Sequence, residues 1–211
     1  NTYYYLGDYD KALLYNHKHL EMAREIGDFQ GEGEAEGSLG VIYDALGDHQ
    51  HALHYHQKYL ETAQMIGDQR GQATARGNIG NSLEQMGEYD LAMQYYSQQL
   101  ELAQKTQDLR REASALGGIG NVYRKKGNIL KAKKFYQRQL DIGYQTSNDH
   151  LTGRSLFNLA LCLHQDGKIR KAISLAERAL EALKPVEGTI KSILSENLKK
   201  WKEELLLIQE A

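Results

Sequence analysis

Apolar residues follow a helical spacing along most of the chain, in pairs of segments separated by glycine. Residues 74–108 show this pattern, with apolar side chains every three or four residues on both sides of Gly87. The two stripes consist of Ile79, Leu83 and Met86, then Tyr89, Ala92, Tyr95, Tyr96, Leu100 and Ala103. This spacing places each set on one face of a helix, so it predicts two amphipathic helices in succession.

A short turn is expected between the two predicted helices. Gly87 can adopt the left-handed backbone conformation that commonly ends a helix. Glu88 and Asp90 favour the start of the next helix, where a negative charge meets the positive end of the helix dipole. The chain has one proline, Pro185, and no strand signal is visible. We therefore predict an all-α fold of antiparallel helix pairs.

The same pattern returns every 40 residues. Three columns carry it: Gly7, Gly47, Gly87, Gly127 and Gly167; Ala12, Ala52, Ala92, Ala132 and Ala172; and Leu20, Leu60, Leu100, Leu140 and Leu180. The segment "ALGGIGNVY" at residues 115–123 belongs to this register, because "SLGVIY", "NIGNSL" and "NLALCL" stand at equivalent places. A phosphate-binding loop would occur once, after a strand. The repetition instead predicts a solenoid in which these glycines are structural.

Small and aromatic columns are expected to pack the helices. Close crossing within a pair is expected at Gly40, Gly80, Gly120 and Ala160, and at the alanine column of the second helix. The space between adjacent pairs is expected to be filled by Tyr15, Tyr55, Tyr95 and Phe135. Because these aromatic residues follow the repeat, we interpret the tyrosines as core and not as a cofactor site or base-stacking surface.

The run "GNIGNSLEQMGEYDLAMQYYSQQLELA" resembles the tetratricopeptide repeat family. The matching residues are Ile79, Gly80, Tyr89, Ala92 and Tyr96. The aromatic residue that usually begins the first helix is replaced by Glu36, Arg76, Leu116 and Leu156, and the closing proline is absent. Both departures suit a 40-residue variant, similar to the repeats of Pins-type polarity adaptors, kinesin light chains and bacterial signalling proteins.

This resemblance implies a right-handed superhelical solenoid. We expect five repeats over residues 1–183, the first truncated at its start, and a capping helix over residues 184–211. Terminal repeats need a cap with a polar outer face; the alternative for this last segment is a partner-binding helix. Its apolar stripe consists of Ile190, Ile193, Leu194, Leu198, Trp201, Leu205 and Ile208. Asn1 falls at a mid-helix position of the repeat, so we expect a longer parent protein.

Charge is nearly balanced overall, at −2, but unevenly distributed. Residues 1–109 contain 7 basic and 17 acidic residues, a net charge of −10, whereas residues 110–211 contain 19 and 11, a net charge of +8. The chain therefore has an acidic end and a basic end. The basic stripe of Lys131, Lys134 and Arg138 leaves three alternatives open: a solvated face, an acidic protein partner and nucleic acid. Nucleic acid is disfavoured, because no aromatic residues interleave there.

Other chemistry is sparse in this sequence. The single cysteine, Cys162, stands in an apolar stretch and is expected to be a buried thiol, which fits a reducing, cytoplasmic compartment. His49, His51, His54 and His56 are predicted to be solvated on the outer surface, because no cysteine or carboxylate completes a metal set in their helix. No apolar run approaches the ~18 residues of a membrane span. We expect no enzyme, no cofactor and no metal.

The family resemblance implies that the first helix of each pair lines a concave groove that holds an extended peptide. The family's groove asparagine follows the small glycine; here it is Asn81 and Asn121, whereas Val41 and Leu161 depart from the pattern. Three residues earlier, on the same face, stand Ser38, Asn78, Gly118 and Asn158. A carboxamide offers two donors and an acceptor, so it can bind peptide backbone of any sequence. A solvated polar face is the alternative.

Charges on this face are expected to set specificity. The fourth and fifth repeats carry Arg124, Lys125 and Arg154, where earlier repeats carry acidic residues such as Glu84. The predicted peptide-binding residues are Ser38, Asn78, Asn81, Glu84, Asn121, Arg124, Lys125, Arg154 and Asn158. We therefore predict a non-catalytic interaction scaffold, with an acidic segment of its partner facing the basic repeats. The alternative is a ligand-sensing regulatory segment of a larger multidomain signalling protein.

Overall fold

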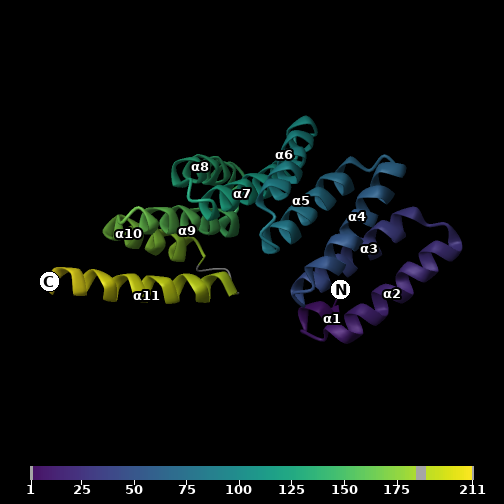
Figure 1. Cartoon of the computed structure of the whole chain (residues 1–211), viewed down its shortest axis with the longest axis horizontal. Helices are drawn as coiled ribbons and strands as arrows, with labels where there is room; N and C mark the ends of the chain where they lie inside the picture. The colour runs from purple at the N-terminus through teal and green to yellow at the C-terminus, as the bar shows by residue number, and fades with distance from the viewer. Residues whose placement is uncertain (1, 184–188, 211) are drawn as a thin grey trace. The chain divides into compact units, whose positions relative to one another are not determined.

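The computed structural model describes residues 2–183 and 189–210, and this part of the chain contains helices and turns but no strand (Figure 1). The predicted all-α fold is confirmed. The helices are α1 (Thr2–Tyr5), α2 (Tyr9–Ile26), α3 (Phe29–Ala45), α4 (His49–Met65), α5 (Gln69–Gln85), α6 (Tyr89–Lys105), α7 (Leu109–Lys125), α8 (Ile129–Gln145), α9 (Asp149–Gln165), α10 (Ile169–Ala182) and α11 (Thr189–Glu210).

The helices follow one another in antiparallel pairs, from α1–α2 to α9–α10, and α11 comes after the last pair. Each helix from α3 to α9 has 17 residues. A turn of three residues, such as residues 46–48, joins each of them to the next. The predicted 40-residue repeat is therefore confirmed, and it consists of two halves of 20 residues each.

The turns share one backbone feature, a residue with positive φ at every twentieth position. Glycine holds seven of these positions: Gly7, Gly27, Gly47, Gly67, Gly87, Gly127 and Gly167. Gln107 (φ 54°) and Ser147 (φ 49°) hold the other two. A left-handed backbone costs a residue with a side chain roughly 1–2 kcal/mol. The predicted role of Gly87, a left-handed residue that ends a helix, is thus confirmed. A residue with positive φ occurs both in the turns within pairs and in the turns between pairs.

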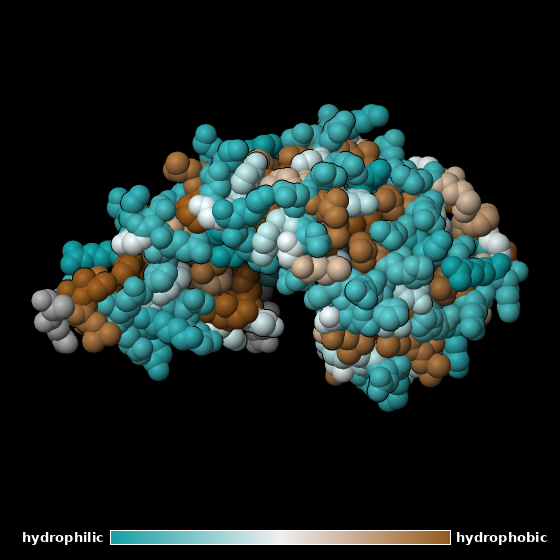
Figure 2. Space-filling view, viewed as in Figure 1, coloured by the Kyte–Doolittle hydropathy of each residue, from teal (hydrophilic) through white to brown (hydrophobic). Residues whose placement is uncertain are grey.

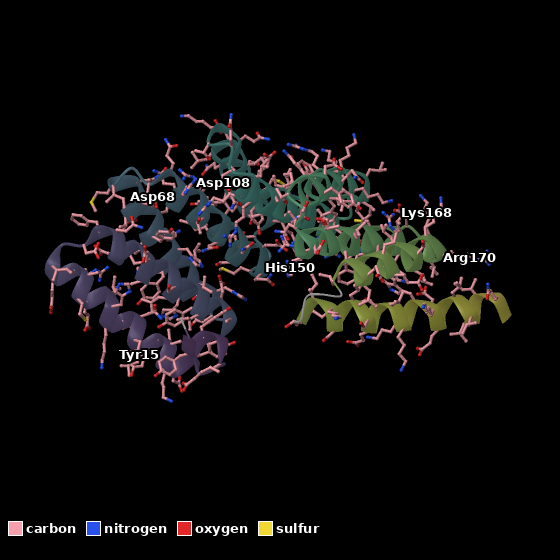
Figure 3. All side chains as sticks on the ribbon, turned by 180° about the vertical axis from the view of Figure 1, so that it is seen from behind. Tyr15, Asp68, Asp108, His150, Lys168 and Arg170 are labelled. Atoms are coloured by element: carbon pink, nitrogen blue, oxygen red, sulfur yellow. The ribbon has the colours of Figure 1, made fainter. Side chains whose placement is uncertain are left out.

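The residue after each positive φ stands directly before the first residue of the next helix. Asp28, for example, accepts a hydrogen bond from the backbone N–H of Gly31 at 2.9 Å, which satisfies one of the free N–H groups of the first turn. The same bond is made by Asp8, Asp48, Asp108, Asn128 and Asn148. Asp68 and Asp108 stand at the starts of α5 and α7 (Figure 3), but the Asp68 side chain makes no such bond. A positive-φ residue followed by an acidic or amide residue therefore sets the helix boundaries at most turns; before α10 the following residue is Lys168, which makes no capping bond.

The chain forms two compact units, residues 1–118 and residues 119–211, with the boundary inside α7. Buried residues of the first unit include Leu20, Ala35 and Leu39. In the second unit one apolar cluster extends from Ala132 on α8 to Trp201 on α11. The boundary predicted at residues 183 and 184 adjoins residues 184–188, which, with Pro185, lie outside the described residues, as does Asn1.

The apolar stripe predicted for the terminal helix α11 is buried only in part, because Ile193 and Ile208 of that stripe are exposed. Leu194, Leu198 and Trp201 are buried in the apolar cluster with residues of α9 and α10. Near the end of α11, Leu206 and Leu207 are exposed, and Figure 2 shows apolar surface at this end of the chain. The packing of α11 on α10 is compatible with a cap, and that role stays a prediction.

Replacing Ser147 with glycine should stabilise the protein. Glycine adopts positive φ without strain, so Ser147→Gly should raise the free energy of unfolding by about 1 kcal/mol, measured by urea denaturation. The control is Ser174→Gly, which makes the same change at an exposed position inside α10 and should lower stability by about 0.5 kcal/mol, because glycine is the poorer helix former. A loss of stability in Ser147→Gly would show that the turn residue is not strained.

Candidate functional site

A groove runs over the first helices of the second and third pairs, α3 and α5. It consists of two adjoining hollows of about 470 and 670 Å³, which share Tyr4, Val41 and Asn78 among their lining residues. Ser38 lines the first hollow and Asn81 the second. The structure therefore brings together three of the predicted peptide-binding residues, Ser38, Asn78 and Asn81. We call this surface the α3–α5 groove.

Glycine on α3 lets an aromatic ring from α4 reach the groove. A Cβ atom on Gly33 or Gly37 would lie 3.2 or 3.1 Å from the ring of Tyr59. Tyr59 and both glycines line the same hollow. One part of the groove is therefore apolar, while Glu34, Ser38 and its asparagines make the rest polar.

Tyr96 on α6 is buried between two glycines. A Cβ atom would lie 2.7 Å from its ring on Gly80 and 2.4 Å on Gly118. A Cβ atom on Gly120 would likewise lie 2.6 Å from the ring of Tyr136. These contacts account for two of the glycines in "ALGGIGNVY", and the predicted close crossing at Gly80 and Gly120 is confirmed.

The fully buried ring column lies one residue after the predicted column. Tyr96 and Tyr136 are 1% and 0% exposed, whereas Tyr15, predicted to fill a gap between pairs, is 50% exposed. The error arose because two aromatic residues are adjacent at residues 95 and 96, so helical spacing alone did not distinguish them. Of the predicted column, the rings of Tyr55 and Phe135 stack on aromatic residues of the first helices.

Hydrogen bonds connect the buried tyrosines to the predicted groove asparagines. The hydroxyl of Tyr96 lies 2.7 Å from Asn81 Oδ1 and 3.0 Å from Glu84 Oε2, and it donates to these acceptors. Tyr136 donates to Asn121 Oδ1 at 2.7 Å. Burial and the adjacent carboxylate of Glu84 raise the pKa of Tyr96 far above its ordinary value, so its hydroxyl remains a donor. These bonds hold each carboxamide by its oxygen.

Glu84 differs from its predicted setting on the groove surface. Its side chain is buried, 5% exposed, and its carboxylate is bonded to Tyr96. This position allows Glu84 to orient the Tyr96 hydroxyl, which in turn holds the Asn81 side chain. In the second to fifth repeats, those without the tyrosine also lack the asparagine: Val41 goes with His56, and Leu161 with Ala176. This pairing of positions 15 residues apart was a signal available in the sequence.

Asp44 joins the second and third pairs at the edge of the groove. Its carboxylate contacts His49 Nδ1 at 2.8 Å and His56 Nε2 at 3.2 Å, and it accepts a hydrogen bond from Ser82 Oγ at 2.9 Å. Burial alone would raise the pKa of Asp44, but hydrogen bonds from His56, His49 and Ser82 outweigh it and hold the pKa below its ordinary value.

The prediction of four solvated histidines is wrong for His56, and His49 is half-buried beside Asp44. Its side chain is fully buried against Gly40 and Asp44, because residue 56 occupies the buried ring column. His51 and His54 are exposed, as predicted. Across residues 2–183 and 189–210, no group of three or more potential metal ligands was found.

In the second unit, the predicted residues lie on α7 and α9. Asn121 and Asn158 are half-buried, and Lys125 is exposed. The Nε atom of Arg124 is buried and has no hydrogen-bond partner within the described part of the chain. Burial also lowers the pKa of the Arg154 guanidinium, which keeps its charge at neutral pH. These two arginines are therefore the basic groups of the predicted face that are most desolvated.

Cys162 is buried, as predicted. Burial raises the pKa of its thiol to about 11, which keeps the sulfur protonated and unreactive at neutral pH. As to membranes, none of the helices between residues 2 and 210, apart from the undescribed 184–188, combines the length and apolar character needed to span one.

Helices of similar length that are joined by short turns and arranged in antiparallel pairs define a helical-repeat protein. A profile of the tetratricopeptide repeat matches residues 1–65, 71–142 and 111–184. The chain therefore belongs to the tetratricopeptide repeat family, as its resemblance predicted. Proteins of this family generally act as protein-interaction scaffolds and are typically non-catalytic.

Many solved structures resemble the chain, and three of them illustrate the likeness. BtubC (BKLC) from P. vanneervenii is 15% identical, with a TM-score of 0.77 over 92% of this chain and 83% of that one. A STAND signal transduction ATPase with a tetratricopeptide repeat sensor, from Pyrococcus horikoshii, is 23% identical, with a TM-score of 0.72 over 94% of this chain but 30% of that one. A putative kinesin light chain repeat protein from Podosopora anserina is 13% identical, with a TM-score of 0.65 over 84% and 88%. These likenesses show the fold.

The Asp44 cluster predicts acid sensitivity. Because the folded-state pKa of Asp44 is lowered, its stabilising contribution is present above about pH 4, the ordinary value, and is lost as pH falls through the folded-state pKa. Urea denaturation of the natural chain and Asp44→Asn at several pH values should therefore give stabilities that converge below pH 4. A difference that stays constant between pH 3 and pH 7 would contradict this role for the Asp44 carboxylate.

Proposed function

We propose that this protein is a non-catalytic scaffold that binds an extended peptide or partner segment in the α3–α5 groove. The main supporting observation is the lining of its two adjoining hollows, because Asn78 lines both of them, Ser38 the first and Asn81 the second. Family membership supports a protein partner in general, and the groove supplies a surface of suitable chemistry for one. A single thiol that is buried fits a cytoplasmic protein.

Asn78 and Asn81 offer different hydrogen-bonding groups to a ligand in the α3–α5 groove. The Asn78 side chain bonds to no other residue in the described part of the chain, so both its donors and its acceptor are available. Asn81 uses Oδ1 to accept from Tyr96, which turns its amide N–H groups toward other acceptors. A peptide carbonyl is such an acceptor, and each hydrogen bond of this kind contributes about 1 kcal/mol. Glu84 acts in this proposal by positioning Tyr96.

The basic residues of the second unit are proposed to contact acidic side chains of the partner. Arg124 has a buried Nε without a partner among the described residues, and Arg154 is partly desolvated. A carboxylate can satisfy both groups through charge-assisted hydrogen bonds. Lys125, Asn121 and Asn158 add polar groups on the same helices.

A second candidate function is a sensor segment within a larger signalling protein. The observation that favours it is the similarity to the STAND ATPase with a tetratricopeptide repeat sensor, of which this chain covers 30%. In that case the groove would hold the sensed ligand, and its occupancy would alter a further domain. The sequence of the full-length parent protein distinguishes the two candidates, because a neighbouring ATPase domain favours the sensor.

Removing the groove carboxamides should weaken peptide binding. We expect a peptide array to yield ligands of the natural chain, and Asn78→Ala with Asn81→Ala to weaken them roughly ten- to hundredfold. Asn78→Ala is the cleaner single change, because Asn81→Ala also removes an acceptor of Tyr96. Gln50→Ala, at an exposed position of α4 outside both hollows, is the control and should bind normally. Peptides held equally by all variants would contradict the proposal.

A further inference from the structure

The second unit has a second groove, which is apolar and is lined by residues of α8, α9 and α10. Its volume is about 580 Å³. We call it the leucine groove, after five leucines that line it: Leu140, Leu156, Leu159, Leu163 and Leu175. Its other lining residues include Lys133, Lys134 and Arg178, which make the rim basic.

This surface differs from the predicted peptide-binding face. At 100° per residue, Leu159, Leu163 and Leu156 lie roughly 100° to 160° around α9 from Asn158. The remaining lining residues come from α8 and α10, the second helices of their pairs. The leucine groove is therefore formed mainly by the second helices, whereas the α3–α5 groove is formed by first helices.

The repeat register explains why the groove is open. In the second repeat the rings of Tyr43 and Tyr55 stack at 5.5 Å, and in the fourth repeat those of Tyr123 and Phe135 do so at the same distance. In the fifth repeat these two positions hold Leu163 and Leu175. Two leucines occupy less volume than two stacked rings, and both of them line the cavity. The third repeat holds Leu83 and Tyr95 at these positions, so the fifth is the repeat in which both are leucine.

The charges at the rim favour one kind of occupant. Lys133 is paired with Asp166, but Lys134 and Arg178 have no ion-pair or hydrogen-bond partner among residues 2–183 and 189–210. Both side chains are exposed beside buried leucines. A partner that covers the leucines would therefore bring its flanking groups next to two unpaired cations, and carboxylates complement them.

We propose that the leucine groove docks an amphipathic helical segment of a partner protein, whose leucine-type side chains enter the groove and whose carboxylates contact Lys134 and Arg178. This is a second binding surface, separate from the peptide-binding function proposed above. In helix-in-groove recognition, the bound helix inserts apolar side chains spaced three, four and seven residues apart into an apolar groove. A helix with leucines at these spacings on one face is therefore the expected occupant.

The test uses a labelled synthetic helical peptide with leucines at i, i+3, i+4 and i+7, flanked by glutamates, and fluorescence anisotropy. The natural chain should bind it at least tenfold more tightly than the same peptide with lysines in place of the glutamates. Leu163→Tyr with Leu175→Phe restores the residues of the fourth repeat and should weaken binding at least tenfold by filling the groove. Lys134→Glu with Arg178→Glu should do the same by reversing the rim charge.

Matched controls separate this proposal from the others. Arg170→Glu with Lys171→Glu makes the same charge change at exposed positions of α10 outside the groove, and should bind normally; Figure 3 shows Arg170 near the start of α10. Asn78→Ala should also bind normally, because it lies in the α3–α5 groove. If the filled variant fails to fold, the charge reversal of exposed residues decides the matter.

Three results would overturn the proposal. One is equal binding of the glutamate and lysine peptides, and another is unchanged binding in the charge-reversed variant. The third is a dimer of the natural chain in sedimentation equilibrium that the filled variant loses, since a second copy would then be the occupant of the groove.

Discussion

The contact between a buried side-chain ring and the backbone of a facing helix is the constraint on which the rest of the structure depends. Tyr96 lies so near Gly80 and Gly118 that a Cβ atom on either would overlap its ring. In the second repeat, His56 contacts Gly40 equally closely. Glycine inside a helix costs about 1 kcal/mol relative to alanine. Glycine occurs at these positions because a ring needs the space. The contact between ring and glycine sets how closely the first and second helices approach each other.

This packing also links the core to the candidate site. The Tyr96 hydroxyl bonds to Asn81, and the Tyr136 hydroxyl to Asn121, so the rings that hold each pair together also fix a polar group on its first helix. In the fifth repeat the ring is replaced by Ala176 and the glycine by Ala160, and no asparagine follows. Variation among repeats therefore changes packing and surface chemistry together.

Much of the fold was predictable because helical periodicity and repetition are local signals. The 40-residue register predicted the helix pairs, the turn at Gly87 and the small residues where helices cross. The 20-residue register of positive φ was missed, because Gln107 and Ser147 interrupt the glycines. The burial of His56 and Glu84 depends on contacts between helices, which spacing does not reveal. Groove residues were predicted by type, but their hydrogen-bond partners required the structure.

A double-mutant cycle between Gly118 and Tyr96, read by urea denaturation, tests the central claim most directly. Gly118→Ala alone should destabilise the natural chain by about 1–3 kcal/mol, because the added methyl group overpacks against the ring. In a Tyr96→Leu background the smaller, flexible side chain can yield, so the same substitution should cost little or nothing, a clear departure from additivity. An equal cost in both backgrounds would contradict the claim that the ring is the reason for the glycine.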